Sequence, residues 1–130
     1  RKTAVKHGAK LENQVADIGR QLKLDVRSKV RVAKRVWGAD RIIDVVLTHP
    51  VTHLSIGLEC KTQTTSGSAE EKIPTTIKDI EAWPIRGLVV MSGDGFSNHL
   101  RHYLYSTGKA VDLEDLEQWL RLYFNLWPEK

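Results

Sequence analysis

The sequence of 130 residues predicts one α/β domain, and three features of the chain lead to this prediction. Apolar residues near the N-terminus recur at three- and four-residue steps, which is the period of an amphipathic helix. Valine-rich, alternating segments follow, and these are typical of strands. Later in the chain, glycine turns separate a compact strand from further helical segments, as in α/β folds. The predicted order is helix, three strands, helix, strand, helix, short strand and helix.

The first helix is predicted over residues 9–23. Its apolar face consists of Leu11, Val15, Ile18 and Leu22. Glu12 follows Leu11 directly and therefore lies at the border of this apolar stripe. We expect the helix to pack behind the sheet with Glu12 at the edge of the contact.

Three closely connected strands are predicted next, as an antiparallel meander. In the first, over residues 24–37, alternation places Val26, Val30 and Val32 on one face and Arg27, Lys29 and Arg31 on the other. The second, over residues 42–47, is apolar except for Asp44, and the third covers residues 54–62. A carboxylate inside an otherwise apolar strand requires a partner, because a buried charge is costly when it is alone.

The second half of the sequence predicts helices that alternate with strands. A polar loop over 63–67 precedes a helix over 69–80, whose start is indicated by the capping-box spacing of Ser68 and Glu71. Pro74 implies a kink or a later start. A strand over 86–91, a helix over 97–105 and a short strand at 110–111 follow. The last helix, capped by Asp112 or Asp115, carries Leu116, Trp119, Leu120, Tyr123 and Phe124.

Composition excludes several classes of protein. The single cysteine, Cys60, excludes an intramolecular disulfide and a cysteine-based zinc cluster, and favours an intracellular, cytoplasmic setting. No apolar run is long enough for a membrane span, so no membrane partner is expected. Residues 1–65 hold 13 Lys and Arg against 6 Asp and Glu, whereas residues 66–130 hold 7 against 10. A polyanion would therefore meet mainly the first half.

The third predicted strand carries the most informative residues. Alternation places Glu59, Lys61 and Gln63 on one face, with Leu58 and Cys60 on the other. Asp44, on the preceding strand, is close enough in sequence for its carboxylate to converge with that of Glu59. Hard carboxylate oxygens are the ligands that Mg²⁺ prefers, and Mn²⁺ could substitute. A lysine on the same face could hold or deprotonate the attacking water, and Glu12 is the natural fourth member.

At these positions the sequence resembles the PD-(D/E)XK nuclease superfamily. The helical glutamate of the family matches Glu12, its strand aspartate matches Asp44, and its E-x-K motif matches residues 59–61. Ile43 stands where the motif has its proline. Over roughly residues 9–92 the resemblance implies a restriction-endonuclease-like core, αβββαβ, with a central mixed sheet flanked by helices and extra C-terminal helices. It also implies catalytic roles for Glu12, Asp44, Glu59, Lys61 and Gln63, with Asp44 and Glu59 as metal ligands.

Basic and hydroxyl side chains around this constellation are candidate DNA contacts. They are Arg27, Lys29, Arg31, Lys34, Arg35, Arg41, Ser66, Ser68 and Lys72. The alternative for the basic residues is a charged edge strand that prevents aggregation. For the serine-rich loop, the alternative is an ordinary capped helix.

The predicted function is that of a Mg²⁺-dependent endonuclease acting on DNA, either type II restriction-like or homing-type. A Holliday junction resolvase, a catalytically inactive nuclease-like DNA-binding domain and a plain α/β interaction domain are the alternatives. Because one site cuts one strand, cleavage of a duplex calls for a homodimer or higher oligomer. The aromatic last helix is the candidate contact between subunits, although it could equally cover the sheet.

Overall fold

The computed structural model describes residues 2–34, 40–62, 69–93 and 97–126. Within these ranges, the side chains of residues 2–9, 34 and 69–74 are outside the description. None of the helices in the described ranges is long and apolar enough to cross a membrane.

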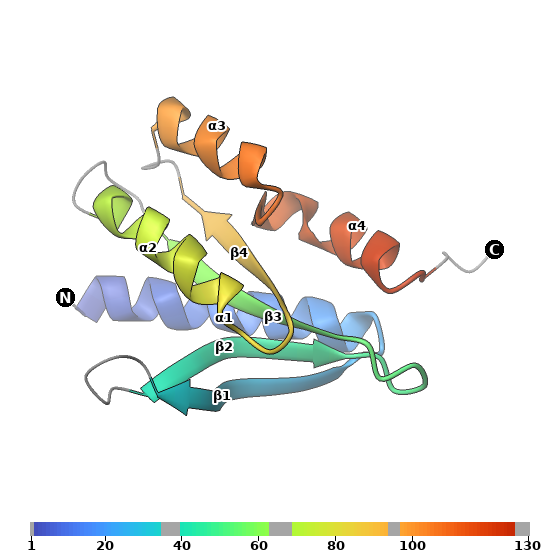
Figure 1. Ribbon diagram of the computed structural model, residues 1–130. Helices are drawn as coiled ribbons and strands as arrows, with labels where there is room; N and C mark the ends of the chain where they lie inside the picture. The colour runs from blue at the N-terminus through green and yellow to red at the C-terminus, as the bar shows by residue number, and fades with distance from the viewer. Residues whose placement is uncertain (1, 35–39, 63–68, 94–96, 127–130) are drawn as a thin grey trace.

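The fold is a five-stranded mixed sheet with helices on both faces (Figure 1). The strands are β1 (Asp25–Lys34), β2 (Asp40–Thr48), β3 (Ser55–Thr62), β4 (Arg86–Ser92) and β5 (Ala110–Asp112), in spatial order β1-β2-β3-β4-β5. The helices are α1 (Lys2–Gln21), α2 (Ala69–Glu81), α3 (Asn98–Thr107) and α4 (Leu113–Tyr123). β1, β2 and β3 are antiparallel, whereas β3, β4 and β5 are parallel. This architecture confirms the predicted α/β restriction-endonuclease-like fold.

Each face of the sheet has its own hydrophobic core. The α1–α4 core includes Leu11, Val15, Val45, Leu58, Val90, Leu116 and Leu120. The α2–α3 core includes Ile43, Ile77, Ile80, Trp83, Val89, Met91 and Leu104. In Figure 1, α2 lies in front of the sheet and α1 lies behind it. The central strands are therefore buried on both faces, which explains the nearly continuous apolar runs of β2 and β4.

Two glycines let the α2–α3 core approach the sheet closely. Gly57 of β3 and Gly87 of β4 are paired in register. A Cβ atom at Gly57 would lie 2.8 Å from the ring of Trp83, and one at Gly87 would lie 2.9 Å from it. Because neither glycine has a side chain, the indole packs directly on the backbone of the two strands.

The first helix begins earlier than the sequence prediction, whereas the second begins where it was predicted. α1 begins at Lys2, earlier than the predicted residue 9. α2 begins at Ala69 and continues through Pro74, so the proline does not delay its start. α3 agrees closely with the prediction: Ser97 caps it by accepting a hydrogen bond from the backbone N–H of Leu100, at 3.2 Å.

The alternation predicted for the first strand is wrong beyond its middle. Val26 packs against the α1–α4 core, whereas Val30 and Val32 pack against the α2–α3 core. The cause is Lys29, whose φ of 54° lies in the left-handed region and interrupts the two-residue period. β2 changes face at the same level, since Ile43 and Val45 lie in different cores.

The apolar face of the last helix covers the sheet. Leu116, Leu120 and Phe124 are buried in the α1–α4 core, and Trp119 and Tyr123 pack against it. Leu122 is the exposed apolar residue of this helix, at 70%. Contact between subunits through α4 therefore stays a prediction, and most of the residues that suggested it have a partner within the chain.

Candidate active site

Five charged side chains from four elements meet beside the point where β2 and β3 separate. We call them the β2–β3 cluster: Glu12 of α1, Lys29 of β1, Asp44 of β2, and Glu59 and Lys61 of β3. β2 and β3 pair from Thr48 with Ser55 to Val45 with Leu58. Asp44 is the next residue of β2 beyond this pairing. Its side chain takes the place of a backbone acceptor: the Oδ2 atom accepts a hydrogen bond from the backbone N–H of Cys60 in β3, at 2.9 Å.

Lys29 joins two of the carboxylates. Its Nζ lies 2.8 Å from Oε1 and 3.0 Å from Oε2 of Glu12, and 3.5 Å from Oδ1 of Asp44. The hydrogen bond to Glu12 is the main reason why the pKa of Lys29 is raised. Lys29 is therefore a cation that holds the helical glutamate and the strand aspartate together.

Glu59 and Lys61 face away from the α1–α4 core, as the alternation predicted, since Leu58 and Cys60 pack into that core. The Nζ of Lys61 lies 3.6 Å from Oε2 of Glu59. Burial first, and then the negative charge of Asp44, raise the pKa of Glu59 to about 7, against the opposing effect of Lys61. Burial beside a second carboxylate thus disfavours the charged form of Glu59.

The charge balance of the cluster fits a divalent cation. Three carboxylates face two ammonium groups, and the side chains of Asp44 and Glu59 are only 18% and 17% exposed. Oxygen ligands on adjacent strands are the donor set that Mg²⁺ accepts, with water completing its shell. Asp44 and Glu59 could therefore hold the ion, and its charge would relieve the repulsion that raises the pKa of Glu59.

Cys60 lies behind the cluster and is no nucleophile. Burial raises the pKa of its thiol, and the charges of Asp44, Glu12 and Glu59 raise it further. The protonated thiol packs against the α1–α4 core.

Lys29 is the member of the cluster that sequence reasoning assigned to a different position. Strict alternation placed it on the outer, basic face of β1 as a phosphate contact. The left-handed backbone at this residue directs the side chain to Glu12 and Asp44 instead. The residue pattern of β1 gives no sign of this left-handed backbone, and the register that places Lys29 between the pairs Ser28–Val45 and Val30–Ile43 is known only from the structure.

The candidate DNA contacts have varied surroundings. Arg27 is exposed, and no ion pair joins it to another described residue. Arg31 pairs with Asp40 at 2.9 Å on the surface of the sheet. Arg41 pairs with Asp79 of α2 at 3.0 Å, and this ion pair is largely buried, so it also holds α2 against β2. Gln63, Arg35, Ser66 and Ser68, and the side chains of Lys34 and Lys72, lie outside the described residues.

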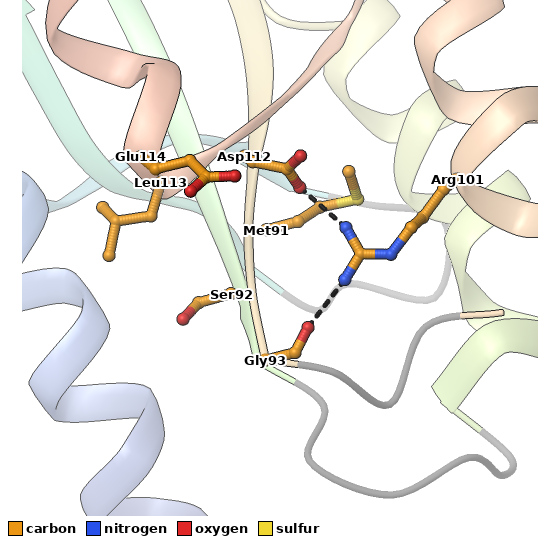
Figure 2. Close-up of a pocket in the computed structure, with 7 residues that line it drawn as sticks. All are labelled: Met91, Ser92, Gly93, Arg101, Asp112, Leu113 and Glu114. Carbon is orange, nitrogen blue, oxygen red and sulfur yellow. Dashed lines mark hydrogen bonds and ion pairs between the residues drawn. The ribbon is translucent and has the colours of Figure 1, made fainter. Parts of the chain in front are cut away.

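A second group of charged residues escaped the sequence analysis. In what we call the Arg101–Asp112 network, Nη1 of Arg101 lies 2.9 Å from Oδ1 of Asp112, and the hydroxyl of Tyr105 donates to Oδ2 at 2.6 Å. Nη2 of Arg101 donates to the carbonyl of Gly93 at 2.7 Å. Figure 2 shows Arg101 reaching from α3 to both partners. Arg101 and Asp112 border a cavity of about 270 Å³, which Glu114 also lines.

Acidic residues gather here as well. Oxygens of Asp112, Glu114 and Asp115 lie within 4.8 Å of one another. Both carboxylate oxygens of Asp112 already accept hydrogen bonds, from Arg101 and from Tyr105. This group is therefore a poorer candidate for a metal centre than Asp44 and Glu59.

The fold and the β2–β3 cluster together define a nuclease-type α/β domain. The chain belongs to the PD-(D/E)XK nuclease superfamily, since the family model described as "PD-(D/E)XK nuclease superfamily domain" matches residues 3–123. The matched region contains every member of the cluster.

One solved structure is similar to the chain at the level of the fold. The chain is similar to the crystal structure of a protein of unknown function, AF1548, with 18% identity, a TM-score of 0.53, and coverage of 78% of this chain and 55% of that one. It also matches the protein VC1899 from Vibrio cholerae, with 13% identity, a TM-score of 0.47, and coverage of 90% and 32%. The chain thus spans about half the length of the first and a third of the second. No curated protein matches the chain.

Proposed function

We propose that the protein is a Mg²⁺-dependent endonuclease that hydrolyses DNA phosphodiester bonds, with type II restriction-like or homing-type cleavage as the first candidate. One observation carries the proposal: Asp44 and Glu59 converge where β2 and β3 separate, with Lys61 3.6 Å from Glu59. Membership of the nuclease superfamily supports the reaction class.

Asp44 and Glu59 would hold the cation, with Mn²⁺ able to replace Mg²⁺. When bound, such an ion lowers the pKa of a coordinated water and polarises a phosphate oxygen. The hydrogen bond from Cys60 N–H fixes one oxygen of Asp44, so the carboxylate is oriented before substrate arrives.

The two lysines would have different tasks. Lys61, whose side chain is 36% exposed, would orient the attacking water and offset the charge that develops on the phosphate. Lys29 would neutralise Glu12 and keep Asp44 in position, because it contacts both carboxylates. Gln63 would extend the Lys61 face by one further step of the strand. Arg27 and Arg31 on β1 would contact phosphates beside the site.

Cleavage of both strands of a duplex would use two copies of the chain, because the proposed site cuts one strand. We therefore propose a homodimer or higher oligomer. Light scattering on the purified chain measures this directly: a monomer mass at micromolar concentration, with and without duplex DNA, would contradict it.

A cleavage assay tests the proposed function. Linear duplex, single-stranded and four-way junction DNA are incubated with the protein, with Mg²⁺ or with EDTA. We expect Mg²⁺-dependent products, and we expect Lys61→Gln to reduce their rate at least about 100-fold. Lys78→Gln, on the exposed part of α2, is the matched control and should cleave like the wild type.

The pattern of substrates separates the nuclease subclasses. Cleavage confined to the four-way junction would identify a junction resolvase. Binding of DNA without cleavage under any metal condition would identify an inactive nuclease-like domain and overturn the proposal.

A further inference from the structure

The cavity beside the Arg101–Asp112 network adjoins the proposed active site. Met91 of β4 is in register with Lys61 of β3 on one side and with Asp112 of β5 on the other. Side chains of residues paired in parallel strands lie on the same face of the sheet. Lys61 on β3 and Asp112 on β5 are two strands apart, which corresponds to about 10 Å between their backbones. Met91 therefore brings one wall of the cavity to within one strand of Lys61, at the same edge of the sheet. Leu113, in another wall, packs against the α1–α4 core on the opposite face.

The cavity combines apolar walls with a few fixed polar groups, as small-ligand sites do. Met91 and Leu113 supply the apolar surface, and Ser92, Arg101 and Glu114 supply polar atoms. Figure 2 shows Met91 and Arg101 on the α3 side of the strand end, and Ser92, Leu113 and Glu114 on its other side. A volume of about 270 Å³ suits a single planar ring system and is too small for a peptide or a duplex.

The polar wall is held in place before any ligand arrives. Arg101 is fixed by the Gly93 carbonyl and by Asp112, and Asp112 is fixed in turn by Tyr105. Groups that are already oriented lose little conformational entropy on binding.

The carboxylates in the cavity wall favour a ligand with N–H donors over a ligand with a phosphate. Glu114 is exposed, and no hydrogen bond or ion pair joins its carboxylate to another described residue. An oxygen of Asp112 lies within 4.8 Å of it, and Arg101 is already paired with Asp112. A phosphate would therefore be repelled, whereas the ring N–H and amino groups of a nucleobase would find an acceptor. Guanine presents two adjacent donors of this kind, which can bind one carboxylate together.

We propose that this cavity is a subsite for one unpaired base, with guanine preferred, of the nucleotide whose phosphate faces Lys61. The proposal rests on the nuclease function proposed above and specifies its substrate further. A base can enter such a cavity only when it is out of the duplex stack. The substrate would therefore be single-stranded DNA, or duplex DNA from which one nucleotide is flipped out.

The single methionine of the chain provides a direct probe, because Met91 lines the cavity. In metal-free buffer, the ¹³C-labelled methyl signal of Met91 is followed while each of the four deoxynucleoside monophosphates is added. We expect the largest shift and the tightest binding with the guanine nucleotide. Glu114→Gln should weaken this binding at least tenfold. Glu117→Gln, one helical turn further along α4 and outside the cavity wall, is the matched control and should bind like the wild type.

Other outcomes overturn the subsite. These are a Met91 signal unaffected by every nucleotide, equal affinity for all four, or binding that Glu114→Gln leaves unchanged. A shift with Mg²⁺ alone and with no nucleotide would identify a cation site instead. Because this titration requires no catalysis, its result is independent of whether the protein cleaves DNA.

Discussion

Two groups of charged side chains lie at neighbouring positions of one sheet edge, and they differ in how their carboxylates are compensated. In the Arg101–Asp112 network, both oxygens of Asp112 accept hydrogen bonds from side chains of α3. In the β2–β3 cluster, Glu59 is buried next to Asp44, and its pKa rises to about 7. The first group is electrostatically satisfied by the protein itself. The second has three carboxylates for two ammonium groups, which is the property expected of the metal centre that we propose.

The largest expected effect is the loss of DNA cleavage when a carboxylate of the β2–β3 cluster is removed. Asp44→Asn should reduce Mg²⁺-dependent cleavage more than about 100-fold, because the pair of metal-binding carboxylates is lost. Asp40→Asn, on the same strand but in a surface ion pair with Arg31, is the matched control. Rates are measured on labelled DNA, with circular dichroism to show that both variants fold. Equal rates for the two variants would contradict the assignment.

The pH dependence of stability tests whether the folded protein disfavours the charged form of Glu59. Its pKa of about 7 in the folded chain exceeds the ordinary value of 4.5, so folding favours the protonated form. The favourable contribution is complete below pH 4.5 and is lost as the pH rises through about 7. In EDTA, the free energy of unfolding should fall over this range by about 3 kcal/mol more in the wild type than in Glu59→Gln. Urea unfolding at several pH values measures the difference, and parallel curves would show that Glu59 is not strained.

Removing the Asp112 carboxylate, whose two oxygens both accept hydrogen bonds, should lower the free energy of unfolding. Asp112→Ala leaves Arg101 and Tyr105 without their common acceptor, and we expect a loss of about 2 kcal/mol in the free energy of unfolding. Asp115→Ala, exposed in the first turn of α4, should lose less than about 0.5 kcal/mol. Urea unfolding at neutral pH compares them. Similar losses in both variants would mean that the network contributes no more than the helix terminus.

The smallest effect concerns one hydrogen bond of the network. Tyr105→Phe removes the 2.6 Å bond to Asp112 and should lower the free energy of unfolding by about 1 kcal/mol. Tyr103→Phe, two residues earlier on α3 and exposed at 46%, is the control and should be neutral. Thermal unfolding of the two variants side by side is sufficient. A neutral Tyr105→Phe would show that Arg101 alone satisfies Asp112.

The two groups also differ in how far the sequence predicts them. Asp44 interrupts an apolar run, and Glu59 and Lys61 alternate with buried residues, so strand periodicity was sufficient to expect their convergence. Lys29 was misplaced because a positive φ at a lysine leaves no mark in the residue pattern. The Arg101–Asp112 network was missed because it joins residues 11 positions apart through the packing of α3 on β5. Asp112 was expected as a helix cap, yet its side chain makes no cap hydrogen bond and binds Arg101 and Tyr105 instead.

The most direct test of the central claim is to locate bound Mn²⁺ by anomalous diffraction from a crystal of the protein. Two sets of carboxylates compete for the ion: Asp44 with Glu59, and Asp112 with Glu114 and Asp115. We predict an anomalous peak between Asp44 and Glu59, next to Lys61. A peak at Asp112 and Glu114, with none at Asp44 and Glu59, would contradict the assignment of the β2–β3 cluster as the metal centre.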